Sequence, residues 1–222
     1  MYETIEITLL SQRDRPVDMT SATSLRHYPA AMVQLDSVGS MLIKAASDLL
    51  ESEGPAALTV RRIATDAGVS TMNVYSRFGS KDGVVEYLFV EGFRRLGAGM
   101  NAAPTTDDSL TDLCACGLAY RQFAIDNPTL YSVMFDRVVP DFEPTAEAKT
   151  LASATLELLA SRIARAMGAG ALRQGDPLHT AALVWATCHG VVSLELKAVD
   201  SPVIDWLEVY RQAMVMIVKG LA

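Results

Sequence analysis

The side chains of this chain that are best suited to a defined chemistry lie between Leu58 and Lys81, in the stretch LTVRRIATDAGVSTMNVYSRFGSK. In the major groove of DNA an asparagine can pair with adenine, an apolar side chain can contact a thymine methyl group, and an arginine can reach guanine or a phosphate. Hydroxyl groups, lysines and the free N–H groups of a helix start can bind phosphate. The residues that we predict to contact DNA are Thr59, Arg61, Ser70, Thr71, Met72, Asn73, Tyr75, Ser76, Arg77 and Lys81.

Two short helices joined by a tight turn would position these side chains. Thr59 is predicted to cap the first helix, because its hydroxyl can accept from the free N–H groups there. Apolar residues then recur at helical spacing up to Ala67, and Gly68 can take the positive φ that closes a helix. The predicted inward residues of this helix are Val60, Ile63, Ala64 and Ala67.

The second predicted helix starts after Ser70, a further N-cap candidate, and ends at Gly79. Val74 and Phe78 are four residues apart and form its inward pair. Ser80 is expected to cap the next helix, which leaves Lys81 in a first turn suited to phosphate. On a helical wheel the residues that point outward are Met72, Asn73, Tyr75 and Ser76.

Together with IKAASDLLESEG upstream, this stretch resembles the tetracycline-repressor (TetR) family of bacterial transcription regulators over residues 38–96. The resemblance implies a three-helix, helix-turn-helix DNA-binding domain followed by a larger helical domain. A different interpretation is a helical hairpin that only packs in a core. That interpretation does not explain why a tyrosine, a methionine and an asparagine share one outward face.

Composition favours an all-α fold. The chain has 222 residues, of which 50% are hydrophobic, and most apolar residues recur at helical rather than strand spacing. No run is long enough to span a bilayer. Glu3 and Glu6 stand where a secretory signal would carry positive charge, so we expect a cytoplasmic protein without a membrane partner.

Three segments are predicted along the chain: an N-terminal extension over 1–37, the DNA-binding domain with its linker helix over 38–99, and a ligand-binding and dimerisation domain over 100–222. The extension is interpreted as loosely docked. Its alternative role is an arm whose arginines, Arg13, Arg15 and Arg26, reach a minor groove. Translation starting at Met19 is a further possibility.

The net charge of −7 at first argues against a DNA partner. The excess of acids is local, however: residues 38–95 hold seven acids and seven bases, whereas the chain from residue 96 holds fourteen acids and nine bases. A patch of Arg61, Arg62, Arg77 and Lys81 remains available for phosphates. Because that patch is small, we expect binding to need two copies of the domain.

The remaining helices are predicted over 82–99, 109–126, 128–135, 144–167, 177–198 and 202–221. Within them, FAIDNPTLYSVMF and WATCHG resemble one branch of TetR-family C-terminal domains, which implies ligand binding and dimerisation. Aromatic side chains with a few polar groups suit a small-molecule pocket. The predicted pocket residues are Phe123, Tyr131, Met134, Phe135, Trp185 and His189, and for His189 a buried core or interface role is the alternative.

A packing seam runs along the last two predicted helices. Two such helices from each of two subunits can form a four-helix bundle, so the seam favours a homodimer. The alternative is that the seam belongs to the core of a single chain. Its members are Leu178, Ala182, Trp185, His189, Val192, Leu196, Trp206, Tyr210, Ala213 and Ile217.

No pattern for catalysis, cofactor binding or metal binding was recognised, so none is predicted. Cys114, Cys116 and Cys188 are expected to be buried thiols, with a redox sensor as the competing interpretation. Two further hypotheses are a catalyst built from Glu195 and His189, and a helical adaptor without DNA binding. The predicted function is a ligand-responsive DNA-binding regulator: a homodimeric repressor that an unidentified small molecule releases from its double-stranded operator.

Overall fold

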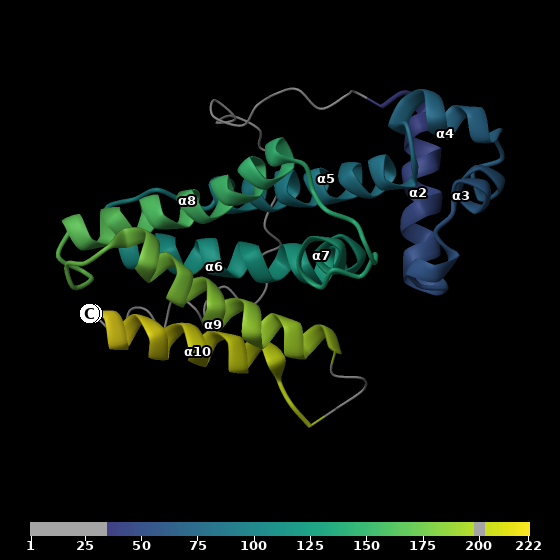
Figure 1. Ribbon diagram of the computed structural model, residues 1–222. Coiled ribbons are helices and arrows are strands. Elements are labelled where there is room, and N and C mark those ends of the chain that lie inside the picture. The colour runs from purple at the N-terminus through teal and green to yellow at the C-terminus, as the bar shows by residue number, and fades with distance from the viewer. Residues whose placement is uncertain (1–34, 198–202) are drawn as a thin grey trace. The chain divides into compact units, whose positions relative to one another are not determined.

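The computed structural model describes residues 35–197 and 203–222, and the regular elements in these two ranges are helices, without a strand (Figure 1). The predicted all-α fold is thereby confirmed. The predicted extension over 1–37, with the hypothesis about Arg13, Arg15 and Arg26, lies outside the described residues except for its last three. The elements are α2 (Ser37–Ser52), η1 (Pro55–Ala57), α3 (Val60–Asp66), α4 (Thr71–Phe78), α5 (Lys81–Ala102), α6 (Ser109–Asp126), α7 (Pro128–Phe135), α8 (Ala146–Gly168), α9 (Pro177–Lys197) and α10 (Trp206–Leu221).

Most predicted helix ends agree with the structure to within about two residues, and those of α6 and α7 agree fully. The predicted start of the last helix, Pro202, is wrong. The helix α10 begins at Trp206, because the Asp205 carboxylate caps it by accepting from the backbone N–H of Glu208 at 3.0 Å. The aspartate cap therefore sets this helix start, four residues after the proline.

The described chain forms two compact units. The head unit comprises the described residues of 26–94 together with Asn127–Ala152, and the body unit comprises Arg95–Asp126 and the described residues of 153–222. Each unit thus combines segments that are far apart in the sequence, whereas the sequence predicts consecutive domains over 38–99 and 100–222.

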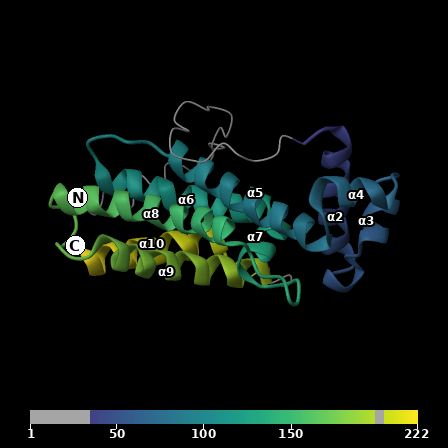
Figure 2. The same ribbon diagram turned by 45° about the horizontal axis from the view of Figure 1, so that its top comes forward.

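In the head unit α2, α3 and α4 pack on one another, and α7 packs on α2 (Figure 2). The side chains that fill the space between α2, α3 and α4 are aliphatic and lie at helical spacing. Their burial removes apolar surface from water and holds the short helices α3 and α4, which are too short to be stable alone. Leu42, Ala46, Ile63 and Val74 have an exposed fraction of 0%.

In the body unit α9 and α10 run side by side, and α6 packs on α9 (Figure 1). Tyr210 of α10 is fully buried, and its hydroxyl donates to the backbone carbonyl of Gly117 in α6 at 2.5 Å. A Cβ on Gly117 would lie 2.6 Å from Cε of Met214, so glycine lets α10 approach α6 closely.

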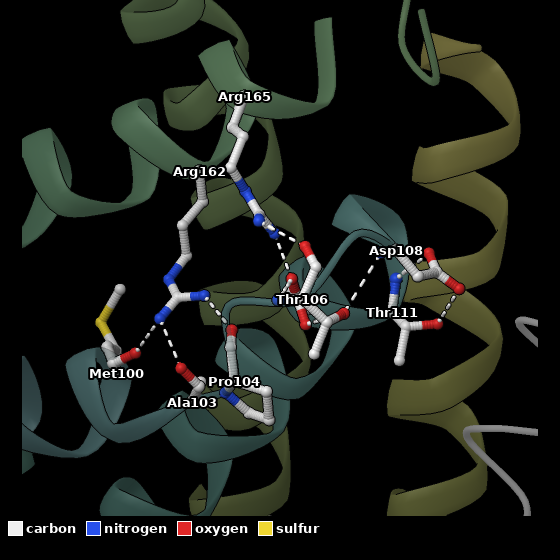
Figure 3. A network of polar contacts seen from close by, with 9 residues as sticks. Met100, Ala103, Pro104, Thr106, Asp108, Thr111, Arg162 and Arg165 are labelled. Carbon is white, nitrogen blue, oxygen red and sulfur yellow. Dashed lines mark hydrogen bonds and ion pairs between the residues drawn. The ribbon is translucent and has the colours of Figure 1, made fainter. Parts of the chain in front are cut away.

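Two arginines of α8 hold the end of α5 and the loop that follows it (Figure 3). Arg162 is buried and donates to the carbonyls of Met100, Ala103 and Pro104 at 2.9 to 3.0 Å. Arg165 donates to the carbonyl of Thr106 at 2.7 Å and pairs with Asp112. These contacts satisfy carbonyl groups in the last turn of α5 and in the loop that follows it.

Candidate nucleic-acid interface and effector pocket

The turn between α3 and α4 has the predicted local chemistry. The Thr59 hydroxyl accepts from the backbone N–H of Arg62 at 3.2 Å, which confirms Thr59 as the N-cap. Gly68 has a φ of 67°, and the backbone N–H of Val69 returns to the carbonyl of Ala64 at 2.9 Å. A left-handed residue at the end of a helix closes it and redirects the chain, so Gly68 sets the direction in which α4 leaves α3.

The turn from α4 to α5 depends on two glycines. Gly79 ends α4 with a φ of 72°, and the Ser80 hydroxyl accepts from the backbone N–H of Gly83 at 3.1 Å, which confirms Ser80 as the cap of α5. A Cβ on Gly83 would lie 1.8 Å from the carbonyl oxygen of Phe78. The role of Gly83 was missed in the sequence, because nothing in its neighbours reveals this close approach of two backbones.

The outward face of α4 carries large exposed side chains. Met72 has an exposed fraction of 69% and Tyr75 one of 52%, although both are side chains that proteins usually bury in part. Thr71 and Ser76 are exposed beside them, and Asn73 is half-buried. Of the residues predicted to contact phosphate, Thr59 and Arg61 are exposed on α3 and its cap, and Lys81 is half-buried at the first turn of α5.

Asn73 and Arg77 take part in a chain of hydrogen bonds that reaches the start of α2. Arg77 donates through Nε and Nη2 to the two carboxylate oxygens of Asp36, at 3.0 and 2.6 Å. Its Nη1 donates to Oδ1 of Asn73 at 2.9 Å, and Nδ2 of Asn73 donates to the Ser70 hydroxyl at 3.1 Å. Ser70 occupies the predicted N-cap position of α4, but its side chain makes no cap hydrogen bond to the backbone.

Asp36 is itself the N-cap of α2, where its Oδ1 accepts from the backbone N–H of Gly39 at 2.7 Å. The hydrogen bond from Arg77, followed by that from Gly39, lowers the pKa of the Asp36 carboxyl to about 2. The carboxylate is therefore ionised at every physiological pH. Sequence reasoning missed the role of Asp36, because its partner Arg77 lies 41 residues further along the chain.

Arg62 is held by acids in the same way. Its guanidinium donates to both carboxylate oxygens of Glu53, at 3.1 and 2.6 Å, and lies 3.5 Å from Asp66. Of the four bases in the predicted phosphate patch, Arg62 and Arg77 are thus engaged by carboxylates of the head unit itself. Less positive charge is available to DNA than the sequence indicates.

The six predicted pocket residues are divided between the two units. Tyr131, Met134 and Phe135 of α7 belong to the head unit. The ring centroids of Tyr131 and Phe135 are 4.9 Å apart with the rings tilted by 59°, and Phe135 meets Phe93 of α5 edge-on at 5.4 Å. Phe123, Trp185 and His189 belong to the body unit. Phe123 and Tyr131 are each 1% exposed, which makes them part of the core of their units.

A cavity of about 230 Å³ lies in the head unit, between the first half of α5, α7 and the segment before α8. Met134 is the one predicted pocket residue that lines it. The walls are mostly aliphatic and aromatic, and three charged residues stand among them. The lining residues are Val85, Phe89, Val133, Met134, Arg137, Val139, Phe142, Glu143, Pro144 and Lys149.

His189 makes contacts within the body unit. Its Nδ1 lies 3.1 Å from the Tyr120 hydroxyl, its Nε2 lies 3.3 Å from the Ser193 hydroxyl, and its ring centroid is 5.5 Å from that of Trp185. Both ring nitrogens have partners, as expected of a histidine with a structural role. His189 is half-buried, and these contacts favour the alternative of a core or interface role.

The predicted seam is buried only in part within one chain, and Leu178 at its start is 49% exposed. Val192 and Tyr210 are fully buried there. Other apolar side chains of the same two helices are exposed: Leu183 and Leu194 of α9 have exposed fractions of 46% and 60%, and Met216 of α10 has one of 67%. We call this surface the exposed stripe: Leu183, Ala186, Gly190 and Leu194 of α9 with Val209 and Met216 of α10.

The structure gives little support to a metal or redox site. Within residues 35–197 and 203–222, no group of three or more histidine, cysteine, aspartate or glutamate side chains could hold a metal ion. Cys114, Cys116 and Cys188 are buried as predicted, and burial raises the pKa of their thiols to about 12, 11 and 11. Across the same ranges no helix combines the length and the apolar character needed to cross a bilayer.

Two family profiles match the chain. The profile described as bacterial regulatory proteins of the tetR family matches residues 42–88, and that of the tetracyclin repressor-like C-terminal domain matches residues 113–205. The two matches together cover more than half of the chain. The chain belongs to the TetR family. It is a helix-turn-helix DNA-binding regulator of transcription, in which α3 and α4 are the helix-turn-helix pair.

Solved structures share this fold. A protein of unknown function from Rhodococcus sp. RHA1 is 25% identical, with a TM-score of 0.73 over 86% of this chain and 99% of its own. The TetR family transcriptional regulator PfmR from Thermus thermophilus is 20% identical, with a TM-score of 0.66 over 82% of this chain and 98% of its own. The fatty acid degradation regulator FadR from Bacillus halodurans is 18% identical, with a TM-score of 0.69 over 85% and 98%. Among curated proteins, none matches the chain.

Proposed function

We propose that this TetR-family protein is a repressor that binds a two-fold symmetric operator as a homodimer and leaves it when a small molecule binds. The observation that carries the proposal is the outward face of α4, where Met72 and Tyr75 are 69% and 52% exposed beside Thr71, Asn73 and Ser76. A helix of eight residues with such side chains fits a major groove, where amide, hydroxyl and apolar groups can read base edges.

In this proposal α4 lies in the groove, and phosphate contacts come from residues around it. Ser70 and Thr71 stand at the N-terminal end of α4, Thr59 and Arg61 belong to the preceding helix and its cap, and Lys81 begins the next. Contacts to phosphate fix the register of the protein on the duplex, whereas contacts to base edges carry the sequence information. Because few basic side chains are available for phosphate contacts, one head unit would bind DNA weakly. The proposal therefore requires two head units.

The exposed stripe supports dimerisation through α9 and α10. Its apolar residues follow one another at three and four positions on α9, and a Cβ on Gly190 would meet nothing within 4 Å. Such a stripe, left exposed on a single chain, can be buried between two copies in a four-helix bundle. Two copies related by a two-fold axis would present two α4 helices to half-sites about one helical turn apart.

The effector part of the proposal uses the residues around α7. The candidate contacts in the head unit are Tyr131, Met134 and Phe135, with the adjoining cavity of about 230 Å³. Phe123, Trp185 and His189 remain candidate contacts in the body unit. A ligand releases DNA only if it binds more tightly to a form of the dimer that fits the operator less well.

Selection of binding sites from random double-stranded DNA by the full-length protein tests the DNA part. Enrichment of a symmetric sequence is expected, and Tyr75→Ala should weaken binding to it without changing the helical content of the protein. If no sequence is enriched, the proposal fails.

Sedimentation equilibrium tests the dimer. Leu194→Glu should produce monomers and reduce operator affinity at least tenfold, because it places a charge in the proposed interface. Glu157→Lys, an exposed charge change on α8, is the control and should leave the dimer intact. A wild-type protein that is monomeric at micromolar concentration would contradict this part of the proposal.

A screen of small apolar compounds by thermal stabilisation, followed by operator titration, tests the effector. A stabilising compound should lower operator affinity, and Met134→Trp should abolish that response by filling the cavity. A compound that stabilises the protein and leaves operator affinity unaltered would argue against allosteric release.

A further inference from the structure

The chain of side chains from Asp36 through Arg77 and Asn73 to Ser70 links the start of α2 to the outward face of α4. Each of its three links contains a hydrogen bond of 2.6 to 3.1 Å. The guanidinium of Arg77 has a weaker second set of contacts, at 3.4 Å to the Asn73 carbonyl and 3.4 Å to the Ser76 hydroxyl. Its side chain is 25% exposed and its donors are directed to groups of the protein.

These bonds determine which way the Asn73 amide is turned. A guanidinium can only donate, so the amide atom that faces Arg77 has to be the oxygen. The amide nitrogen then faces the Ser70 hydroxyl, which can accept. The orientation of Asn73 follows from the donor character of Arg77, and that of Arg77 follows from its two-point contact with Asp36.

The amide keeps unused hydrogen-bonding capacity in this orientation. An asparagine side chain has two N–H groups and two acceptor lone pairs. In the two side-chain contacts of Asn73, Arg77 takes one lone pair and Ser70 takes one N–H. One donor and one acceptor remain, and this is the pair that asparagine presents to N7 and the N6 amino group of adenine.

We propose that Asp36 and Arg77 are positioning residues that hold the Asn73 amide ready to read an adenine in each operator half-site, and that Arg77 does not itself contact a phosphate. This inference rests on the proposed DNA-binding function of α4 and adds the base that one of its residues recognises. It replaces the direct contact from Arg77 to guanine or phosphate that the sequence predicts.

Two features of the pair agree with a positioning role. Carboxylate and guanidinium meet at two points, a geometry that fixes direction as well as distance. Asp36 is also anchored by its cap contact to Gly39, at 2.7 Å, so the carboxylate is attached to the first turn of α2. Preorganised side chains lose less entropy when they bind, which favours discrimination at the base they read.

The test uses the full-length protein and the operator obtained by site selection. Wild-type protein should lose about tenfold or more in affinity when the adenine facing Asn73 is replaced in both half-sites. Asp36→Asn keeps a residue able to cap α2, and Arg77→Met removes the guanidinium. Asp36→Asn and Arg77→Met should each reduce the discrimination for adenine to the level seen in Asn73→Ala. Added to Asn73→Ala, neither change should reduce the discrimination any further.

The control is Asp48→Asn. It removes one negative charge from the same helix, but Asp48 pairs with Lys44 in an exposed contact at 2.6 Å. This variant should keep the wild-type discrimination. The slope of log affinity against log salt concentration should be the same for Arg77→Met and wild type.

Two results would overturn the inference. If Arg77→Met keeps the adenine discrimination and makes the salt slope shallower by about 0.9 per head, Arg77 contacts a phosphate directly. If wild-type protein enriches a sequence whose recognition does not depend on Asn73, the positioning role is wrong while the proposed function stands. If no sequence is enriched, the proposed function fails and the inference fails with it.

Discussion

Arg121 of α6 and Glu195 of α9 form a two-point ion pair within the body unit. Nε of Arg121 donates to Oε2 of Glu195 at 2.8 Å, and Nη2 donates to Oε1. Only 14% and 13% of the two side chains are exposed. The carboxylate therefore serves to join two helices, which argues against the hypothesis of a catalyst built from Glu195 and His189.

Removing one partner of this pair should destabilise the protein. Glu195→Ala leaves a largely buried guanidinium without its counter-ion, for which we expect a loss of about 3 kcal/mol in the free energy of unfolding. Replacing both residues, as in Arg121→Met with Glu195→Leu, should cost less than either single change. Urea denaturation measures both effects, and a double variant that is less stable than either single variant would contradict the expectation.

Gly83→Ala should be strongly destabilising. The new Cβ would lie 1.8 Å from the backbone carbonyl oxygen of Phe78. That oxygen cannot move without distorting the turn between α4 and α5. We expect a loss of about 3 kcal/mol or more, together with loss of DNA binding. Gly92→Ala is the matched control, since its Cβ would come closer than 3 Å only to the flexible side chain of Met134, at 2.4 Å from Sδ and 2.9 Å from Cγ. Thermal unfolding measures the difference, and the melting temperature of Gly83→Ala should be the lower of the two. Similar melting temperatures would refute the role given to Gly83.

The three cysteines should be inert in the native protein. Burial raises the pKa of Cys114 to about 12 and those of Cys116 and Cys188 to about 11, so at pH 8 almost no thiolate, the reactive form, is present. Ellman's reagent should modify no thiol on these residues before unfolding and all three in urea. Rapid modification of any of them in native protein would instead revive the redox-sensor hypothesis.

Asp36 should titrate well below an ordinary aspartate. Its pKa is lowered to about 2 from a reference of 3.8, so its pairing stabilises the folded state fully above about pH 4 and the stabilisation is lost as pH falls toward 2. Carboxyl carbon chemical shifts followed by NMR should give a midpoint near 2 in wild type, and one nearer the reference in Arg77→Met. Equal midpoints in the two proteins would show that Arg77 does not hold this carboxylate in solution.

Local chemistry made much of the fold predictable. Capping groups and glycines act over a few residues, so Thr59, Gly68, Gly79 and Ser80 could be assigned from their neighbours alone, and the structure confirms each of them. The start of α10 was missed for a related reason. A proline suits the first turn of a helix, but the cap from Asp205 was the stronger signal.

The candidate site was predictable only in part. The exposure of Met72 and Tyr75 follows from the helical wheel, because Val74 on the opposite face has to be buried. The partners of Arg62 and Arg77 do not follow from it. Glu53 and Asp36 lie 9 and 41 residues away in the sequence, and a charge count treats their arginines as available for phosphate.

The same limit applies to the last two helices. The apolar seam on α9 and α10 was visible in the sequence, but periodicity does not distinguish a face that packs within one chain from a face that packs between two. Tertiary structure buries Val192 and Tyr210 inside the body unit and leaves Leu183, Leu194 and Met216 exposed.

The sequence by itself determined the helical class, the helix-turn-helix pair and its outward residues, because these depend on periodicity, capping and turn chemistry within a few residues. Only the tertiary structure decided which arginines are held by carboxylates, which way the Asn73 amide is turned, and which apolar face stays exposed. Those outcomes depend on contacts between residues that are distant in the chain, and their geometry exists only once the helices have packed.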